Sequence, residues 1–452
     1  MLSLFSYSLL SIGIRAIRPG RIRTNPFSCS FRYWPRSART SYICVVLNSA
    51  RQILGDSSIV NESIARALRN AAQVFLFASL VPLCATPFCT TARAQALRDV
   101  DEHAAGDSPA DPGPLANDLS GKLSHAAVTA AIRKVADWQL ARVKDQASQD
   151  WTFATLYLGL LEASNTLRDP RYMEHVSAVA EHFHWTLGPR KTHADDQAIG
   201  QSYLWLYSRH PDPQRIAPLR RQFDEVMLEP DDPQKPVWWW CDALFMAPPV
   251  WTRLASATHD GKYLDYMDRQ WHITANLLWD PEEHLFFRDK SYLDKREKNG
   301  KKIFWSRGNG WVMGGLVQVL TYMPESDPRR PFYIEKFRQM AQRLRALQSG
   351  DGLWRPGLLD AADYPWPEIS GSSFFVYAMA WGVRHGLLAR SEFQPAVERG
   401  WAGLVNHVYE DGRLGSIQPI GAAPGDYTPR SSYVFGVGAF LLAGSEVNQL
   451  SR

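Results

Sequence analysis

Cysteine is scarce in this chain of 452 residues, and most of it lies near the N-terminus. Cys29, Cys44, Cys84 and Cys89 precede residue 97, so that Cys241 is alone in the rest of the chain. One thiol cannot form an internal disulfide, and no C-x-x-C spacing indicates a redox or zinc site. The 12 histidines show no paired ligand spacing and no acidic run resembles a calcium loop, so we expect neither a metal nor a cofactor.

The N-terminal part has no apolar run long enough to span a bilayer. Its run AAQVFLFASLVPLCA follows Arg66 and Arg69 and precedes the small residues of TARAQA, which are the three parts of a secretory signal peptide. We therefore predict a signal peptide over 66–96, a periplasmic or secreted bacterial location, and no membrane contact after cleavage. Residues 1–65 are basic and aperiodic, and we interpret them as a disordered extension or a gene-start artefact. A transit peptide is the alternative.

The chain after residue 96 has no excess of basic residues. Residues 1–96 hold 11 of the 50 basic residues and 2 of the 46 acidic ones, which leaves 39 basic and 44 acidic residues and a net charge of −5. This balance predicts no nucleic-acid partner. An Asp/Pro/Gly-rich linker over 97–117 leads into a single domain that we expect to cover 118–449.

Twelve segments of this domain repeat apolar residues at three- and four-residue spacing, which predicts helices. Amphipathic segments such as IEKFRQMAQRL alternate with segments that are apolar on most faces, such as VMGGLVQVL. Amphipathic helices suit an outer ring and apolar ones an inner ring. The turn from Asp169-Pro170 to Tyr172 also recurs at Asp260-Gly261 to Tyr263, and more loosely at Asp327-Pro328 to Tyr333. Six such hairpins predict an all-α fold, a closed (α/α)6 barrel.

The segment WWWCDALFMAPPVW, residues 238–251, is unlike a packing helix. Three consecutive tryptophans point in different directions around any backbone, so at least one should face a cavity. Indole faces bind sugar rings. A carboxyl group at Asp242 held against indole loses hydration, which raises its pKa and suits a general acid. The alternative is that Asp242 only caps the helix that starts at Ala243.

Several sequence blocks resemble one enzyme family over essentially everything from residue 120 onward: HADDQAIGQSYLWLY, WWWCDALFMAPPVW, WDPEEHLFFRDKSY, FWSRGNGWVMGGL and EISGSSFFVYAMAWG. They resemble glycoside hydrolase family 105, the unsaturated rhamnogalacturonyl hydrolases, with the unsaturated glucuronyl hydrolases of family 88 as sisters. The resemblance implies a small oligosaccharide substrate from pectin breakdown, ending in a 4,5-unsaturated galacturonic acid linked to rhamnose. It implies hydration of the double bond, with Asp242 as the acid that protonates C4.

The resemblance also implies a second active-site aspartate in the block that holds Asp195 and Asp196. The adjacent pair leaves the choice open. We favour Asp196 as catalytic and place Asp195 with it in the substrate site, although a helix cap or first-turn acid is an equal alternative for whichever faces away. His193, three residues before Asp196, is a further candidate for substrate binding.

The remaining candidates for substrate binding lie in three other blocks. Arg307 and Trp311 lie four residues apart in RGNGW, which suits a guanidinium on the uronate and an indole under the ring. Trp239 and Trp240 are expected to line the subsite for the following sugar. Arg288 occupies a position where relatives often have histidine, and its role as a sugar contact stays open.

Two other classes of protein fit parts of the sequence. An (α/α)6 epimerase or inverting glycosidase would need paired catalytic histidines or two separated glutamates, and Glu162 and Glu368 could serve the latter. A non-catalytic oligosaccharide-binding protein on the same toroid is the third possibility. We expect a monomer or homodimer.

Overall fold

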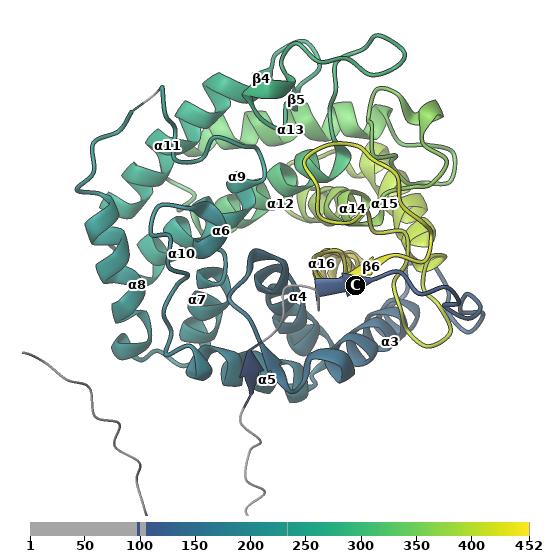
Figure 1. Ribbon diagram of the computed structural model, residues 1–452, viewed down its shortest axis with the longest axis horizontal. Coiled ribbons are helices and arrows are strands. Elements are labelled where there is room, and N and C mark those ends of the chain that lie inside the picture. Colours follow the sequence, from purple (N-terminus) through teal and green to yellow (C-terminus); the bar gives the residue numbers. More distant parts are fainter. Residues whose placement is uncertain (1–96, 100–104, 233, 452) are drawn as a thin grey trace, which may run out of the picture. The chain divides into compact units, whose positions relative to one another are not determined.

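The computed structural model describes residues 97–99, 105–232 and 234–451, so the predicted extension and signal peptide lie outside the described residues. The described part holds twelve long helices in which outer and inner members alternate along the chain (Figure 1). The outer helices are α3 (His125–Val143), α5 (Pro170–His182), α8 (Pro213–Val226), α11 (Lys262–Leu278), α13 (Arg330–Ala346) and α15 (Arg390–Val405). The inner helices are α4 (Trp151–Leu167), α7 (Gly200–Arg209), α10 (Pro248–Thr258), α12 (Ser306–Tyr322), α14 (Ile369–Arg384) and α16 (Val434–Leu450).

The inner helices form a closed ring, because each packs on the next and α16 returns to α4 (Figure 1). The predicted all-α (α/α)6 barrel is thereby confirmed. Since outer and inner helices alternate, all inner helices run in the same direction and begin at one end of the ring, here called the mouth. Within the described residues no helix combines the length and apolar character that a membrane crossing requires.

Burial explains which helices lie inside. Every residue of α12 from Ser306 to Leu320 is buried, and so is α14 from Ile369 to Val383. The outer helix α13 buries residues at three- and four-residue spacing on a single face, among them Tyr333, Phe337 and Met340. The amphipathic segment IEKFRQMAQRL thus lies in the outer ring and the apolar segment VMGGLVQVL in the inner ring, as the sequence predicts.

Two glycines allow α4 and α16 to cross closely. A Cβ atom on Gly159 would lie 2.5 Å from the carbonyl oxygen of Gly438, and one on Gly438 would lie 2.3 Å from that of Thr155. Any side chain at either position would force the two helices apart, so this contact closes the ring only because both residues are glycine.

The recurring turn has a structural purpose. In each copy the tyrosine hydroxyl at the start of an outer helix donates to an aspartate on the preceding outer helix, across 2.7, 2.9 and 2.8 Å respectively: Tyr172 to Asp137, Tyr263 to Asp224 and Tyr333 to Asp268. These bonds tie neighbouring outer helices together, which explains why the motif repeats.

Short strand pairs occur in the segments that connect the helices. The strands β1 (Arg98–Asp99) and β3 (Gln146–Ala147) are parallel. The antiparallel pairs are β2 (Gly106–Asp107) with β6 (Ser432–Tyr433), and β4 (Trp279–Asp280) with β5 (Leu285–Phe286). Single bridges between Trp240 and Asp289, and between Trp305 and Gly357, join neighbouring loops at the mouth.

Candidate active site

Two one-turn helices precede inner helices at the mouth and contact each other: α6 (Ala194–Gln197) before α7, and α9 (Ala243–Met246) before α10. The break after α9 has a local cause, because Pro248 and Pro249 supply no backbone N–H and favour a new helix start. The contact between α6 and α9 brings the loop of Asp195 and Asp196 to that of Asp242.

Asp242 is 8% exposed and lies at the start of α9. Its side chain makes no capping hydrogen bond, so Asp242 does not serve as a simple helix cap. Its Oδ2 accepts from the thiol of Cys241 at 3.4 Å and lies 3.6 Å from Nε of Arg288. Burial raises the pKa of the Asp242 carboxyl, and the charges of Arg288 and Arg307 only partly oppose that rise. The group is therefore suited to hold a proton.

Asp195 is the second carboxyl with a raised pKa in this region. Burial, followed by the negative charge of Asp242, raises the pKa of Asp195 to about 7. Nδ1 of His193 lies 3.8 Å from Oδ2 of Asp195, and the imidazole packs on the Trp240 ring with centroids 4.9 Å apart. That Nδ1 atom is buried without a hydrogen-bond partner, and burial lowers the pKa of His193. A neutral imidazole and a carboxyl that titrates near neutrality thus lie together.

Asp196 faces away from this pair and binds Arg190. Its carboxylate accepts from the backbone N–H of Arg190 at 2.7 Å, from Nε at 3.0 Å and from Nη2 at 2.5 Å. These bonds hold the loop before α6 in place, and they occupy both carboxylate oxygens of Asp196. The geometry favours Asp195, whereas the sequence favoured Asp196, and which of the two is catalytic stays a prediction. Arg190 was missed there, although it lies only six residues before its partner.

Arg288 is held beside Asp242 by the loop that follows β5. Its carbonyl accepts from the N–H of Cys241 at 2.8 Å, and its Nη1 donates to Oδ2 of Asp289 at 2.7 Å. The guanidinium also lies 5.4 Å from the ring centre of Trp239, which is 45% exposed, whereas Trp240 is buried. Trp239 is therefore the accessible indole of the predicted pair, and Arg288 connects it to Asp242.

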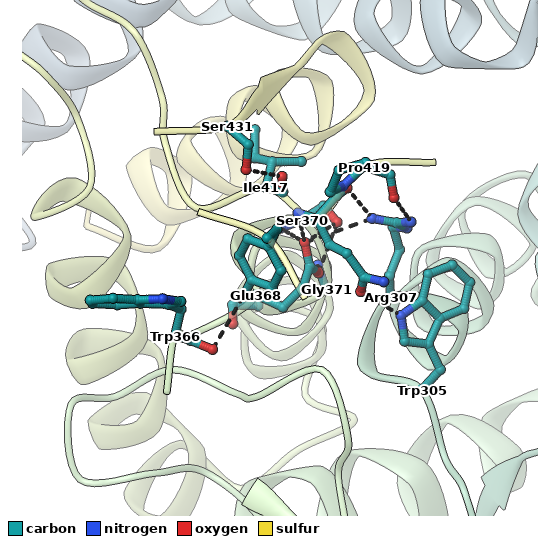
Figure 2. Close-up of polar contacts among 12 residues, drawn as sticks. Trp305, Arg307, Trp366, Glu368, Ser370, Gly371, Ile417, Pro419 and Ser431 are labelled. Atoms are coloured by element: carbon teal, nitrogen blue, oxygen red, sulfur yellow. Dashed lines mark hydrogen bonds and ion pairs between the residues drawn. The ribbon is translucent and has the colours of Figure 1, made fainter. Parts of the chain in front are cut away.

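Arg307 binds protein groups rather than open space (Figure 2). Its side chain is 1% exposed, and Nη1 and Nη2 donate to the carbonyls of Gln418 and Pro419 at 2.5 and 2.6 Å. It was expected to bind the uronate directly. Instead it anchors the loop between α15 and β6, and its charge acts on Asp242 through space.

Glu368 belongs to the same cluster (Figure 2). It is fully buried and accepts from the N–H and hydroxyl of Ser370, from the N–H of Gly371 at 2.6 Å and from the N–H of Gln418 at 3.1 Å. Because all these bonds cap α14 and hold the loop, Glu368 does not fit a glycosidase acid or base. Glu162 binds Trp205 Nε1 at 2.9 Å. The sequence did not single out Gln418, which joins this cluster to Trp305 at 2.9 Å.

Trp311 lies in the core. It is fully buried, and its ring contacts four other aromatic rings, those of Trp151, Phe245, Phe374 and Phe435. The expectation that it lies under the sugar ring is therefore wrong. Four-residue spacing from Arg307 placed both side chains on one helix face, but that face turns into the barrel wall.

The described residues include no group of three or more histidine, cysteine, aspartate or glutamate side chains that could hold a metal ion. The chemistry available at this site comes from two carboxyls with raised pKa values, Asp242 and Asp195, with Arg288 and His193 beside them.

A helical toroid with two desolvated carboxyls at its mouth fits a six-hairpin glycoside hydrolase. The sequence profile of Glycosyl Hydrolase Family 88 matches residues 123–451, and the chain belongs to that family. The predicted resemblance and enzyme class are confirmed.

The chain is similar to proteins named unsaturated 3S-rhamnoglycuronyl hydrolase. The one from Formosa agariphila is 42% identical over 350 residues, covering 73% of this chain and 93% of the relative. The one from Alteromonas sp. is 34% identical over 346 residues, covering 69% and 83%. Among solved structures, one named polysaccharide lyase BACCELL_00875 is 34% identical with a TM-score of 0.69, covering 72% of this chain and 97% of that one.

Proposed function

We propose that this glycoside hydrolase removes a 4,5-unsaturated uronic acid from the non-reducing end of rhamnose-containing oligosaccharides. The observation that carries the proposal is the buried Asp242 carboxyl, which makes no helix cap and has a raised pKa. The names of the relatives from Formosa agariphila and Alteromonas support the same kind of substrate.

In the proposed reaction Asp242 donates its proton to C4 of the unsaturated ring, and positive charge develops at C5 beside the ring oxygen. Water adds at C5, and its released proton returns to a carboxylate, either Asp242 or Asp195. The resulting hemiketal opens by breaking the bond between C5 and the ring oxygen, which leaves a ketone at C5. The hemiacetal at C1 then collapses to an aldehyde and releases the aglycone. No covalent enzyme intermediate is needed.

The sequence resemblance implied a galacturonyl-rhamnose linkage. The names of the two relatives instead favour a glucuronyl linkage in the proposed substrate. Elimination makes C4 and C5 trigonal, so unsaturated residues derived from galacturonic and glucuronic acid become the same sugar and differ only in anomeric linkage. The site around Asp242 cannot distinguish their origin at C4. We therefore expect the linkage and the aglycone to decide specificity, with a sulfated rhamnose as the first candidate, as in the names of the relatives.

The proposal is tested by the ultraviolet absorbance of the conjugated double bond. Incubation with unsaturated uronyl-rhamnose disaccharides, with and without a 3-sulfate, should abolish the absorbance and release rhamnose. Asp242→Asn should lower kcat by at least about a thousandfold while the protein stays folded. Unchanged absorbance with every unsaturated uronide would remove the proposal.

A polysaccharide lyase is the second candidate, favoured by the name of the solved structure that is 34% identical to this chain. A lyase would use a base to abstract the proton at C5, for which Asp195 with a pKa of about 7 is the suitable group. The two reactions give opposite signals, because a lyase creates the double bond that the hydrolase consumes. A rise in absorbance on an intact polysaccharide would select the lyase.

We also propose that the protein is exported to the periplasm or medium as a monomer or homodimer. The apolar run over 71–85 and the TARAQA segment support export. N-terminal sequencing of the exported form should begin near residue 97. A start upstream of residue 66 would contradict the signal peptide, and sedimentation of the same sample would give the oligomeric state.

A further inference from the structure

A cavity of about 580 Å³ lies next to the site, between the loop that precedes α9 and the loop that follows β5. Its lining includes the exposed Trp239, together with Lys235, Asp289 and Lys290. The proposed reaction uses none of these side chains. Leu277 of α11 also lines it, so the cavity opens beside the mouth rather than inside the ring.

The position of the cavity relative to Asp242 follows from Arg288. Nε of Arg288 lies 3.6 Å from Asp242, and its guanidinium carbon lies 5.4 Å from the ring centre of Trp239. A sugar whose C4 meets Asp242 would therefore place its aglycone beside Trp239. An indole face packs against the apolar face of a sugar ring, and substituents on that ring would then point toward Lys235 and Lys290.

The charge of the cavity is positive. Asp289 is neutralised within the protein, because its carboxylate accepts from Nη1 of Arg288 at 2.7 Å and from the N–H of Ser291 at 2.8 Å. Lys235 and Lys290 are exposed, and neither forms an ion pair with any described residue. Two uncompensated ammonium groups attract an anion locally, although the chain after residue 96 carries a net charge of −5.

We propose that this cavity, the Lys235–Lys290 subsite, binds an anionic group on the aglycone, either a sulfate ester or a carboxylate. The proposal rests on the proposed function, because it takes the unsaturated sugar to lie at Asp242. A lysine ammonium is a compact point charge with three donors, so two of them suit the several acceptor oxygens of either anion. The subsite makes Lys235 and Lys290 specificity-determining residues.

The decisive variant is K235Q/K290Q, which removes both charges and keeps side-chain length. Arginine at both positions preserves the charge, and Lys122→Gln removes a charge from an exposed lysine before α3 that does not line the cavity. Affinity is measured by calorimetry in the Asp242→Asn background, so that binding is read without turnover. The ligands are the unsaturated disaccharide with a sulfated rhamnose, its desulfated form, and a trisaccharide with a further uronate.

We expect the double glutamine variant to lose about 10- to 100-fold in affinity for the sulfated ligand and less than about twofold for the desulfated one. The loss should shrink as salt is raised, and the arginine and Lys122 variants should bind normally. A loss confined to the trisaccharide would identify the anion as a carboxylate. Equal effects on charged and uncharged ligands, or none, would overturn the subsite. If the wild type turns over no unsaturated substrate, the proposed function fails, whereas these binding ratios still decide the subsite.

Discussion

Nε of Arg288 lies 3.6 Å from Oδ2 of Asp242. An arginine keeps its charge at every working pH, whereas a histidine would lose it near neutrality. The proton on Asp242 is therefore set by two opposing effects, burial that raises its pKa and a permanent positive charge that lowers it.

Removing this charge should move the pH profile. Arg288→Met removes the largest of the effects that oppose burial at Asp242, so the pKa of Asp242 should rise further. Since Asp242 must be protonated to donate, the alkaline limb of kcat against pH should move up by about one unit. Arg288→Lys keeps the charge and serves as the control, with a limb within a few tenths of the wild type. A limb that moves to lower pH would contradict the assignment of Asp242 as the acid.

Asp195→Asn should lower the activity and raise the stability of the protein. The folded pKa of about 7 lies above the ordinary value of 3.8, so the protonated carboxyl is favoured in the folded state. The associated stability is present at low pH and is lost as the pH rises from about 4 through 7. The uncharged asparagine should therefore raise the free energy of unfolding by about 1–3 kcal/mol at pH 8 and change little at pH 4.5.

Thermal denaturation of Asp195→Asn at both pH values gives the measurement, alongside kcat/KM. Asp196→Asn is the matched control, because it leaves Arg190 without its ionic partner. The Asp196→Asn variant should lose stability at both pH values. Stability of Asp195→Asn that falls at pH 8 would show that Asp195 makes favourable ionised contacts.

Glu368→Gln should weaken the fold more than the chemistry. An amide in place of the carboxylate offers one acceptor where Ser370, Gly371 and Gln418 all donate. We expect a loss of about 1–3 kcal/mol in the free energy of unfolding and a kcat within about tenfold of the wild type when assayed well below Tm. A kcat that falls a thousandfold with unchanged stability would restore the glycosidase alternative.

Arg253→Met should destabilise the packing of the inner helices α10, α12 and α14. The buried guanidinium donates to the hydroxyl of Tyr322 at 2.8 Å and to Oε1 of Gln318 at 2.5 Å, while Gln318 donates to the hydroxyl of Tyr377 at 2.6 Å. These bonds link α10, α12 and α14, and without the arginine the Tyr322 hydroxyl and Oε1 of Gln318 lose their donor.

The expected loss is about 2–4 kcal/mol in denaturant unfolding, with normal kcat at low temperature. Arg269→Met removes an exposed ion pair with Asp231 and should cost less than about 1 kcal/mol. Equal losses in the Arg253 and Arg269 variants would contradict the idea that the buried network stabilises the barrel.

The sequence by itself determined the ring architecture and one carboxyl of the site. Helical periodicity and the contrast between apolar and amphipathic segments depend on local spacing and burial, so they are readable before folding. Asp242 was identifiable because a lone acid among tryptophans and prolines is unusual for a packing helix. The recurring Asp and Tyr turn was visible as a pattern, although its bond between adjacent outer helices was not.

Only the tertiary structure distinguished the surroundings of Asp195 from those of Asp196, because Arg190 binds Asp196 whereas His193 lies beside Asp195. It also decided that Trp239 is accessible while Trp311 is enclosed by four rings contributed by α4, α9, α14 and α16. Burial of a side chain depends on partners distant in sequence, and no spacing within one segment contains that information.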